Sequence, residues 1–354
     1  MVNSFLRHSI IDLRSDTLTL PTTDMLQTIL TSQFGDSGRW DAERRGEDPT
    51  VNKLEDMAAK MMGKEAAAFC NSGTMGNNAA LLTHCRPGDL VLVDEQQHLY
   101  RTEKGAFSPR FGQLKALTYR ADKDGNPDVN DISELLRNNS VKLVCVENTH
   151  NNRGGLCLPI SSMQAVYEAA HRHNAQVHLD GARIFNAAAA LQIDTKELAQ
   201  YADSVMFCVS KGLGAPVGSL VCGTYKFIYE LRETRRFLGG DMRQSGILAA
   251  PAIYALQSNI TRLRKDNKHA STLTSHLHNL RNIHCPEHAD SNIIMLTVPT
   301  GRAEELQRRL REHRIIGGIV DDTRVRLVFH QEISDTETQQ IIAELTLVDK
   351  EMSR

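Results

Sequence analysis

The chain has 354 residues, of which 41% are hydrophobic and 24% are charged, the usual proportions of a globular protein. This length predicts about two domains, or one large domain with a smaller companion. Lys and Arg total 41 and Asp and Glu total 43, so the formal net charge of -2 argues against an extended nucleic-acid-binding surface. No apolar run approaches the roughly 20 residues of a membrane span, so neither nucleic acid nor a membrane is an expected partner.

The cysteine pattern predicts an intracellular protein. Seven cysteines are scattered along the chain without a C-x-x-C pair, which disfavours a disulfide framework and a structural zinc site. The first residues, MVNSFLRHSI, lack the pattern of a secretory signal. We therefore expect reduced thiols, a cytoplasmic location and no metal-binding residues.

The middle of the chain alternates strand-like and helix-like segments. Apolar runs such as VKLVCVE (141–147) are typical of strands buried on both faces of a sheet. Helical patterns with short connections lie between these runs and predict an α/β fold with a mainly parallel sheet. The candidate strands are residues 66–70, 90–94, 141–147, 176–180, 204–209 and 219–222.

The pattern changes after residue 246. A long helical stretch at 247–280 is followed by a strand-like segment, a helix, a Gly-Gly turn at 317–318, another strand and a last helix. This succession predicts a smaller α+β domain. We expect an N-terminal arm over residues 1–20, a large domain over 21–246 and a small C-terminal domain over 247–354.

Residues that follow the predicted strands are the candidates for a site, because ligands of open α/β sheets collect beyond the C-terminal strand ends. The first such segment is NSGTMGNN (71–78), at a strand-to-helix turn. Its small residues let backbone N–H groups approach an anion, and Ser72 and Thr74 add hydroxyl donors. A simple tight turn explains the same residues equally well. Walker and Rossmann glycine patterns are absent.

Two charged residues also follow predicted strands. Asp180 ends one strand. Its carboxylate could bind a protonated heterocycle, and the alternatives are an ion pair with Arg183 or a helix N-cap. Lys211 follows the apolar run VMFCV, where a lysine can form a Schiff base, or alternatively lies in a solvated loop. A phosphate cup, a carboxylate and an amine at one sheet edge are together what pyridoxal 5′-phosphate (PLP) requires.

Several segments resemble the low-specificity threonine aldolases, which belong to the fold-type-I, β-eliminating lyase superfamily of PLP enzymes. The resemblance runs from about residue 11 to residue 330. It implies a seven-stranded sheet and a PLP-dependent retro-aldol cleavage of a threonine- or allo-threonine-like β-hydroxy-α-amino acid to glycine and an aldehyde. The segments are LRSDT (13–17), GEDPTVNKLE (46–55), NSGTMGN (71–77), ENTHN (147–151), HLDGARIFNA (178–187), SKGLGAPVGS (210–219) and GGDMRQSGILAA (239–250).

The resemblance also implies roles for single residues around the cofactor. Lys211 would form the Schiff base and Asp180 would pair with the ring nitrogen. Gly73 and Thr74 would bind the phosphate. His98 would stack on the ring, and a second histidine in ENTHN, His150, would lie near the substrate hydroxyl. Both histidines follow strand-like runs and have a pKa suited to proton transfer near neutral pH.

Arginines are the expected binding partners of the substrate carboxylate and the cofactor phosphate. The resemblance implies that Arg183 and Arg326 hold the substrate carboxylate, with Ser15 at the same end of the site. An arginine near GGDMRQSG, Arg243 or else Arg235 or Arg236, would reach the cofactor phosphate of a neighbouring subunit. A homo-oligomer, a dimer of dimers, is therefore expected.

The chain departs from the family in the loop over residues 34–45, which is longer than usual and places Arg45 where the family has a tyrosine. One hypothesis is that Arg39, Arg44 or Arg45 recognises a more polar β-substituent, and a surface rearrangement is the alternative. Beyond His98, Glu103 keeps the family's acidic position, while Arg101 and nearby basic residues add positive charge.

Three other functions remain open. A related PLP lyase would release a keto acid and ammonia by β-elimination instead of glycine and an aldehyde. A catalytically silent PLP-binding protein would lack turnover, although the retained Lys211, Asp180, His98 and His150 argue against it. A nucleotide-binding module would use the glycine turn alone.

Overall fold

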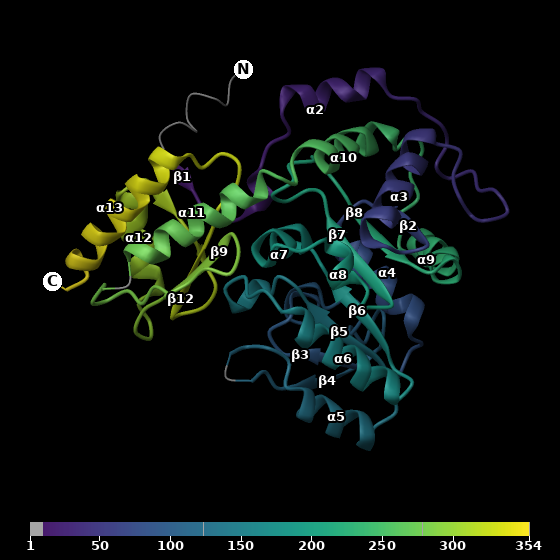
Figure 1. Ribbon diagram of the computed structural model, residues 1–354, viewed down its shortest axis with the longest axis horizontal. Coiled ribbons are helices and arrows are strands. Elements are labelled where there is room, and N and C mark those ends of the chain that lie inside the picture. The colour runs from purple at the N-terminus through teal and green to yellow at the C-terminus, as the bar shows by residue number, and fades with distance from the viewer. Residues whose placement is uncertain (1–9, 123, 278, 354) are drawn as a thin grey trace.

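The structure, a computed structural model, describes residues 10–122, 124–277 and 279–353. A seven-stranded sheet forms its centre, in the order β2-β8-β7-β6-β5-β3-β4 (Figure 1). Strand β8 runs antiparallel to both its neighbours, and the other adjacent pairs are parallel. The predicted α/β fold with a mainly parallel sheet is confirmed. The strands are β2 (Ala66–Cys70), β3 (Leu90–Asp94), β4 (Lys115–Tyr119), β5 (Val141–Glu147), β6 (Gln176–Asp180), β7 (Ser204–Cys208) and β8 (Ser219–Gly223).

Side chains alternate between the two faces of this sheet, and helices cover both. Val205 and Phe207 point into the larger core, whereas Met206 and Cys208 point to the other face. The larger core lies under α3 (Pro49–Met62), α5 (Val129–Asn138), α6 (Ile160–Arg172), α8 (Thr195–Ala199) and α10 (Gly246–Ser258). The other face is covered by α4 (Gly73–His84) and α9 (Tyr225–Phe237).

The C-terminal part builds a second core around a three-stranded antiparallel sheet in the order β11-β12-β9. The start of the described chain joins it, because β1 pairs with β10 and Ile11 and Leu13 are buried in this core. Its elements are β1 (Ile11–Asp12), β9 (Ile293–Thr297), β10 (Ile315–Ile316), β11 (Gly318–Ile319), β12 (Arg324–Val328), α11 (Leu263–His276), α12 (Ala303–Glu312) and α13 (Asp335–Glu351).

The transition between the two cores comes one helix later than predicted. Helix α10 buries Ala249, Ala252 and Ile253 in the larger core, so it belongs to the large domain and not to the small one. The helical stretch predicted at 247–280 is two helices, α10 and α11. Of the predicted arm over 1–20, residues 1–9 lie outside the described residues, and β1 packs on the small domain (Figure 1).

Short helices complete the chain. In the parts that the structure describes, no helix combines the length and the apolar character that crossing a bilayer demands. The remaining elements are η1 (Asp16–Leu18), α2 (Thr23–Gln27), η2 (Thr28–Thr31), the π-helical η3 (Leu99–Glu103), η4 (Asn151–Arg153) and α7 (Ile184–Leu191).

Candidate active site

The site lies at the C-terminal edge of the parallel strands. Strands β2, β3, β5, β6 and β7 run in one direction, so the residues that follow them meet at the same edge of the sheet. A cavity of about 370 Å³ opens there. It is lined by most of the predicted site residues: Ser15, Ser72, Gly73, Thr74, His98, Asp180, Arg183, Lys211 and Arg326.

The glycine-rich turn after β2 forms one wall of this cavity, at the start of α4. Ser72 is the N-cap, and its Oγ accepts a hydrogen bond from the Met75 N–H at 3.1 Å. A Cβ on Gly73 would lie 2.8 Å from the Cys208 Sγ, so only glycine lets the turn approach β7 this closely. Ser72, Gly73 and Thr74 all line the cavity at the N-terminus of α4, a position where backbone N–H groups are suited to an anion.

Asp180 is buried at the end of β6, and its carboxylate does not pair with Arg183. Asp180 Oδ2 accepts a hydrogen bond from Asn77 Nδ2 at 2.9 Å, and Oδ1 accepts one from the Ala182 N–H at 3.1 Å. Arg183 is instead bound to Asp16, at 2.7 Å from each of two nitrogens. The ion-pair alternative for Asp180 is therefore wrong, and the carboxylate remains directed at the cavity.

Lys211 lies directly beyond β7 and is half-buried against the cavity. The backbone around it is held by the Gly214 N–H, which donates to the Lys211 carbonyl at 2.8 Å. Gly218, on the same loop, has φ +117°, and a Cβ there would meet Phe69 at 2.4 Å. The glycine-rich loop thus folds tightly against β2 and places the lysine at the cavity and not in a solvated loop.

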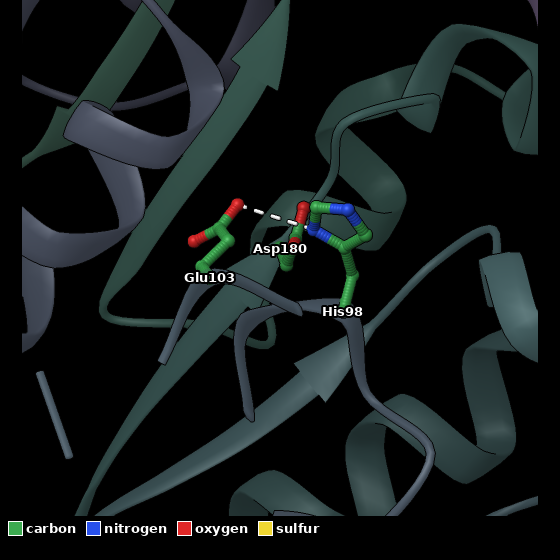
Figure 2. Close-up of side chains that lie close together, drawn as sticks. All are labelled: His98, Glu103 and Asp180. Atoms are coloured by element: carbon green, nitrogen blue, oxygen red, sulfur yellow. Dashed lines mark hydrogen bonds and ion pairs between the residues drawn. The ribbon is translucent and has the colours of Figure 1, made fainter. Parts of the chain in front are cut away.

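His98 and Glu103 form the opposite wall. The π-helical turn η3 brings Glu103 back to His98, whose Nδ1 lies 3.2 Å from Glu103 Oε1 (Figure 2). Burial lowers the pKa of His98, but the hydrogen bond to Glu103 and the charge of Asp180 outweigh it and hold this pKa above its ordinary value. Ligand-type atoms of His98, Glu103 and Asp180 all lie within 4.8 Å of one another.

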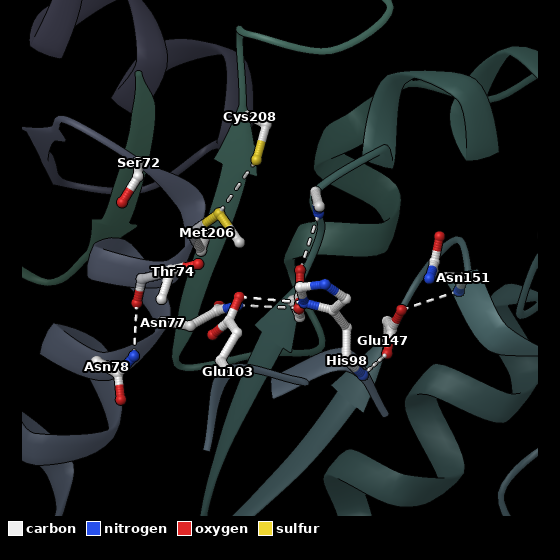
Figure 3. Close-up of polar contacts among 12 residues, drawn as sticks. Ser72, Thr74, Asn77, Asn78, His98, Glu103, Glu147, Asn151, Met206 and Cys208 are labelled. Carbon is white, nitrogen blue, oxygen red and sulfur yellow. Dashed lines mark hydrogen bonds and ion pairs between the residues drawn. The ribbon is translucent and has the colours of Figure 1, made fainter. Parts of the chain in front are cut away.

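Glu147 fixes two cavity residues through their backbones. Its Oε2 accepts the His98 N–H at 2.7 Å, and its Oε1 accepts the Asn151 N–H at 2.8 Å (Figure 3). Burial raises the pKa of Glu147, although the two N–H donors act in the opposite direction. The sequence reasoning assigned no role to Glu147, Asn151 or Asn77. A carboxylate ending an otherwise apolar strand was the available signal for Glu147.

The two predicted arginines converge on Asn151. Its Oδ1 accepts hydrogen bonds from Arg326 Nη1 at 2.7 Å and Arg183 Nη1 at 3.3 Å. Arg326 Nε is buried without a hydrogen-bond partner among the described residues, and burial lowers the pKa of Arg326 to about 10. Ser15 lines the cavity beside them. A guanidinium at the wall of a cavity is suited to bind a carboxylate.

Two predicted residues lie elsewhere. His150 is buried but does not line the described cavity, and its Nε2 lies 3.4 Å from Asp94 Oδ2. Arg243 is exposed and pairs with Asp36 at 3.2 Å, away from the cavity of its own chain. His150 follows β5 as predicted, but its ring turns towards the end of β3 instead of the opening. Of the alternative arginines, Arg235 is buried against the Phe69 carbonyl.

The fold and this site define a class of enzyme, and the family match agrees. The beta-eliminating lyase family model matches residues 12–300, so the chain belongs to that family and is a lyase. Within it, the chain is 38% identical to low-specificity L-threonine aldolase 1 of Arabidopsis thaliana, over 94% of each chain. It is 36% identical to the low specificity L-threonine aldolase of Escherichia coli, over 94% of this chain and 97% of that one. The resemblance to the threonine aldolases is therefore confirmed.

Solved structures share the fold at lower identity. A Leishmania major threonine aldolase superposes with a TM-score of 0.77 at 19% identity, covering 96% of this chain and 99% of that one. A serine palmitoyltransferase structure with PLP superposes with a TM-score of 0.76 at 17% identity, covering 97% of this chain and 88% of that one. The chain thus has the fold of these enzymes.

Proposed function

We propose that this protein is a PLP-dependent aldolase that cleaves a β-hydroxy-α-amino acid such as threonine or allo-threonine to glycine and an aldehyde. One observation carries the proposal: a single cavity is lined by an amine, a carboxylate, a helix N-terminus suited to an anion and a guanidinium. The 38% and 36% identity to threonine aldolases supports the same reaction.

The cavity residues fit PLP group by group. The α4 N-terminus with Gly73 and Thr74 would hold the phosphate, Asp180 the ring nitrogen, and Lys211 the aldehyde carbon. His98 would lie against the ring. When bound, PLP supplies an acceptor for the electrons of the broken Cα–Cβ bond.

The residues around the substrate would orient it and move its proton. Arg326 and Ser15 would bind the carboxylate, while Arg183, already held by Asp16, would add positive charge. Fixing the carboxylate sets which bond at Cα is aligned for cleavage. Since Glu103 engages His98 Nδ1, Nε2 is the nitrogen left to accept the proton of the β-hydroxyl. A direct role for His150 stays a prediction.

A substrate with a more polar β-substituent is a second candidate, and Arg101 supports it in place of the arginines of the altered loop. Arg45 pairs with Asp56 at 2.6 Å and Arg44 with Glu233 at 2.7 Å, and neither arginine lines the cavity. Arg101 instead lines a side pocket of about 280 Å³ that shares His98 and Arg326 with the main cavity. No acidic residue lines this side pocket within the described ranges.

Product analysis separates these possibilities. Threonine, allo-threonine, phenylserine and β-hydroxyaspartate would be incubated with the holoenzyme, and glycine, aldehyde, keto acid and ammonia would be quantified. Equimolar glycine and aldehyde are expected. A keto acid with ammonia would indicate β-elimination, and no product with any substrate would indicate a silent cofactor-binding protein. Preference for β-hydroxyaspartate that is lost in Arg101→Gln would favour the polar substrate.

We also propose a homo-oligomer, a dimer of dimers, in the cytoplasm. Leu30 and Phe237 are 86% and 80% exposed, and large apolar side chains exposed to this degree fit subunit contacts. The exposed Arg243 fits a role at a neighbouring subunit's phosphate. Seven free, buried cysteines fit a reducing compartment. Light scattering of the holoenzyme tests the assembly.

A further inference from the structure

A run of hydrogen bonds leads away from the cavity beneath Asp180, between α4 and the sheet. Asp180 Oδ2 is joined to Asn77 Nδ2 at 2.9 Å, and Asn77 Oδ1 lies 3.1 Å from His178 Nε2. His178 Nδ1 lies 2.8 Å from Ser204 Oγ. The same hydroxyl lies 2.8 Å from His84 Nε2, near the end of α4.

These side chains meet because of the helix and strand periods. His178 and Asp180 are two residues apart on β6 and therefore face the same side of the sheet, towards α4. Asn77 and His84 are seven residues apart on α4 and face the sheet together. All but His84 are at least nine-tenths buried, so none of these groups can be satisfied by bulk solvent.

The direction of every hydrogen bond is fixed by the carboxylates at one end. Asn77 Nδ2 lies 2.9 Å from Asp180 and 3.2 Å from Glu103, so the amide must turn its N–H groups towards these two acceptors (Figure 3). Its carbonyl then faces His178 Nε2, which has to carry a proton. The reversed amide would place its oxygen against two carboxylates.

The remaining directions follow from the neutral form of His178. Complete burial lowers the pKa of His178 to about 3, so the ring carries one N–H, at Nε2. Nδ1 then accepts from the Ser204 hydroxyl, and that hydroxyl oxygen accepts from His84 Nε2. Each donor in the run therefore points towards Asp180.

We propose that His178 is a positioning residue, whose Nε2–H tautomer holds Asn77 so that the Asp180 carboxylate stays aimed into the cavity. The proposal rests on the proposed function, in which Asp180 holds the ring nitrogen of PLP in its protonated form. His178 does not line the cavity and would act only through Asn77. Without the His178 donor, the buried Asn77 carbonyl loses its hydrogen bond, and a shift of the side chain that satisfies it weakens the charge-assisted hydrogen bond to Asp180.

The test compares two replacements. His178→Leu removes the donor, whereas His178→Gln keeps an N–H group near the position of Nε2 and an acceptor behind it. In holoenzyme loaded with ¹⁵N-labelled PLP, the ring nitrogen resonance reports its protonation directly. We expect a protonated ring nitrogen in wild type, a loss of protonation in His178→Leu with kcat reduced about 10- to 100-fold, and recovery in His178→Gln to within about threefold of wild type. His171→Leu, on α6 across the sheet and paired with Asp203, is the matched control.

A second measurement does not depend on the variants folding. ¹⁵N spectra of histidine-labelled wild type should show His178 protonated at Nε2 and neutral between pH 6 and pH 9. Protonation at Nδ1, a charged ring, or a His178→Leu holoenzyme whose ring nitrogen and kcat match wild type would overturn the proposal. If wild type bound no PLP, the proposed function would fail, and the tautomer would still decide whether the run of donors exists.

Discussion

Asp16 and Arg183 form a buried, two-bonded ion pair that ties the N-terminal arm to the end of β6. Both hydrogen bonds are 2.7 Å long, and the two side chains are at most 5% exposed. The pair takes Arg183 away from Asp180, its neighbour in sequence, and leaves Asp180 to Asn77. Because Arg183 pairs with Asp16, the Asp180 carboxylate at the cavity is held by the neutral donors of Asn77 and Ala182 and not by this arginine.

Replacing Asp16 should therefore destabilise the protein strongly. Asp16→Asn leaves the Arg183 charge buried without its partner, so we expect the free energy of unfolding to fall by about 3 kcal/mol at pH 7. The exposed pair of Asp12 with Arg14 offers a matched control, and Asp12→Asn should cost at most about 1 kcal/mol. Urea unfolding of the three holoenzymes checks this, and equal midpoints for Asp16→Asn and wild type would contradict it.

The same pair predicts a pH dependence. Although burial favours the neutral acid, Arg183 holds the pKa of Asp16 at about 2, below the ordinary 3.8. The unfolded chain therefore binds the proton more readily, and the stabilisation is present above pH 3.8 and lost as the pH falls towards 2. The stability difference between wild type and Asp16→Asn should be constant from pH 7 to pH 5 and should shrink below about pH 4. A difference that grows on acidification would contradict this assignment.

Glu103 should set the acid limb of the activity. Because the bond to Glu103 raises the pKa of His98, kcat/KM for threonine should rise with pH around a midpoint above 6.5. In Glu103→Gln, the effect of burial, which lowers the pKa of His98, is no longer opposed by Glu103, so the midpoint should move to lower pH. The exposed Glu95→Gln is the control and should leave the midpoint in place. An unchanged midpoint in Glu103→Gln would show that another group titrates.

Arg326 should control binding of the substrate carboxylate. Arg326→Leu removes the guanidinium from the cavity wall, and we expect KM for threonine to rise about 10- to 100-fold, as for a charged hydrogen bond. Arg326→Lys keeps the positive charge and should recover part of the lost affinity. The recovery should be incomplete because a lysine cannot bind a carboxylate through a planar fork. Arg14→Leu, an exposed neighbour paired with Asp12, should leave KM within about twofold. Similar KM values for Arg326→Leu and Arg14→Leu would exclude the role.

The altered loop should matter for stability and not for substrate choice. Arg45 is bound to Asp56 and Asn52 on α3, outside the cavity. Arg45→Tyr should therefore leave the order of preference among β-hydroxy-α-amino acids unchanged and cost at most about 1 kcal/mol of stability. A reordered substrate panel would restore the loop as a specificity element.

The sequence predicted the parallel strands well because both of their faces are buried. Strands β2, β3, β5 and β6 have the predicted ends, and in β2, β3 and β5 a nearly continuous apolar run marks a strand that helices cover on both faces. Strand β4, KALTY, was missed because it lies at the edge of the sheet and is largely half-buried or exposed. The helix α10 was assigned to the wrong core because its apolar sequence does not say which core it joins.

The residues of the candidate site likewise divide into those that the sequence predicts and those that it does not. Lys211 and Asp180 could be found because they lie at or just beyond the ends of strands that share one edge of the sheet. Asn77, Asp16 and Glu147 act through tertiary contacts with residues up to 276 positions away, which local patterns do not encode. His98 and His150 both follow strands, and only packing decides that one ring lines the cavity while the other turns to Asp94.

Reductive trapping tests the central claim most directly. Purified protein would be incubated with PLP, treated with sodium borohydride, digested and analysed by mass spectrometry. The account predicts a visible absorption band before reduction, and one pyridoxyl-phosphate group per chain afterwards, on Lys211 and absent from Lys211→Ala. A protein that stays colourless, or a cofactor fixed on a different lysine, would contradict it.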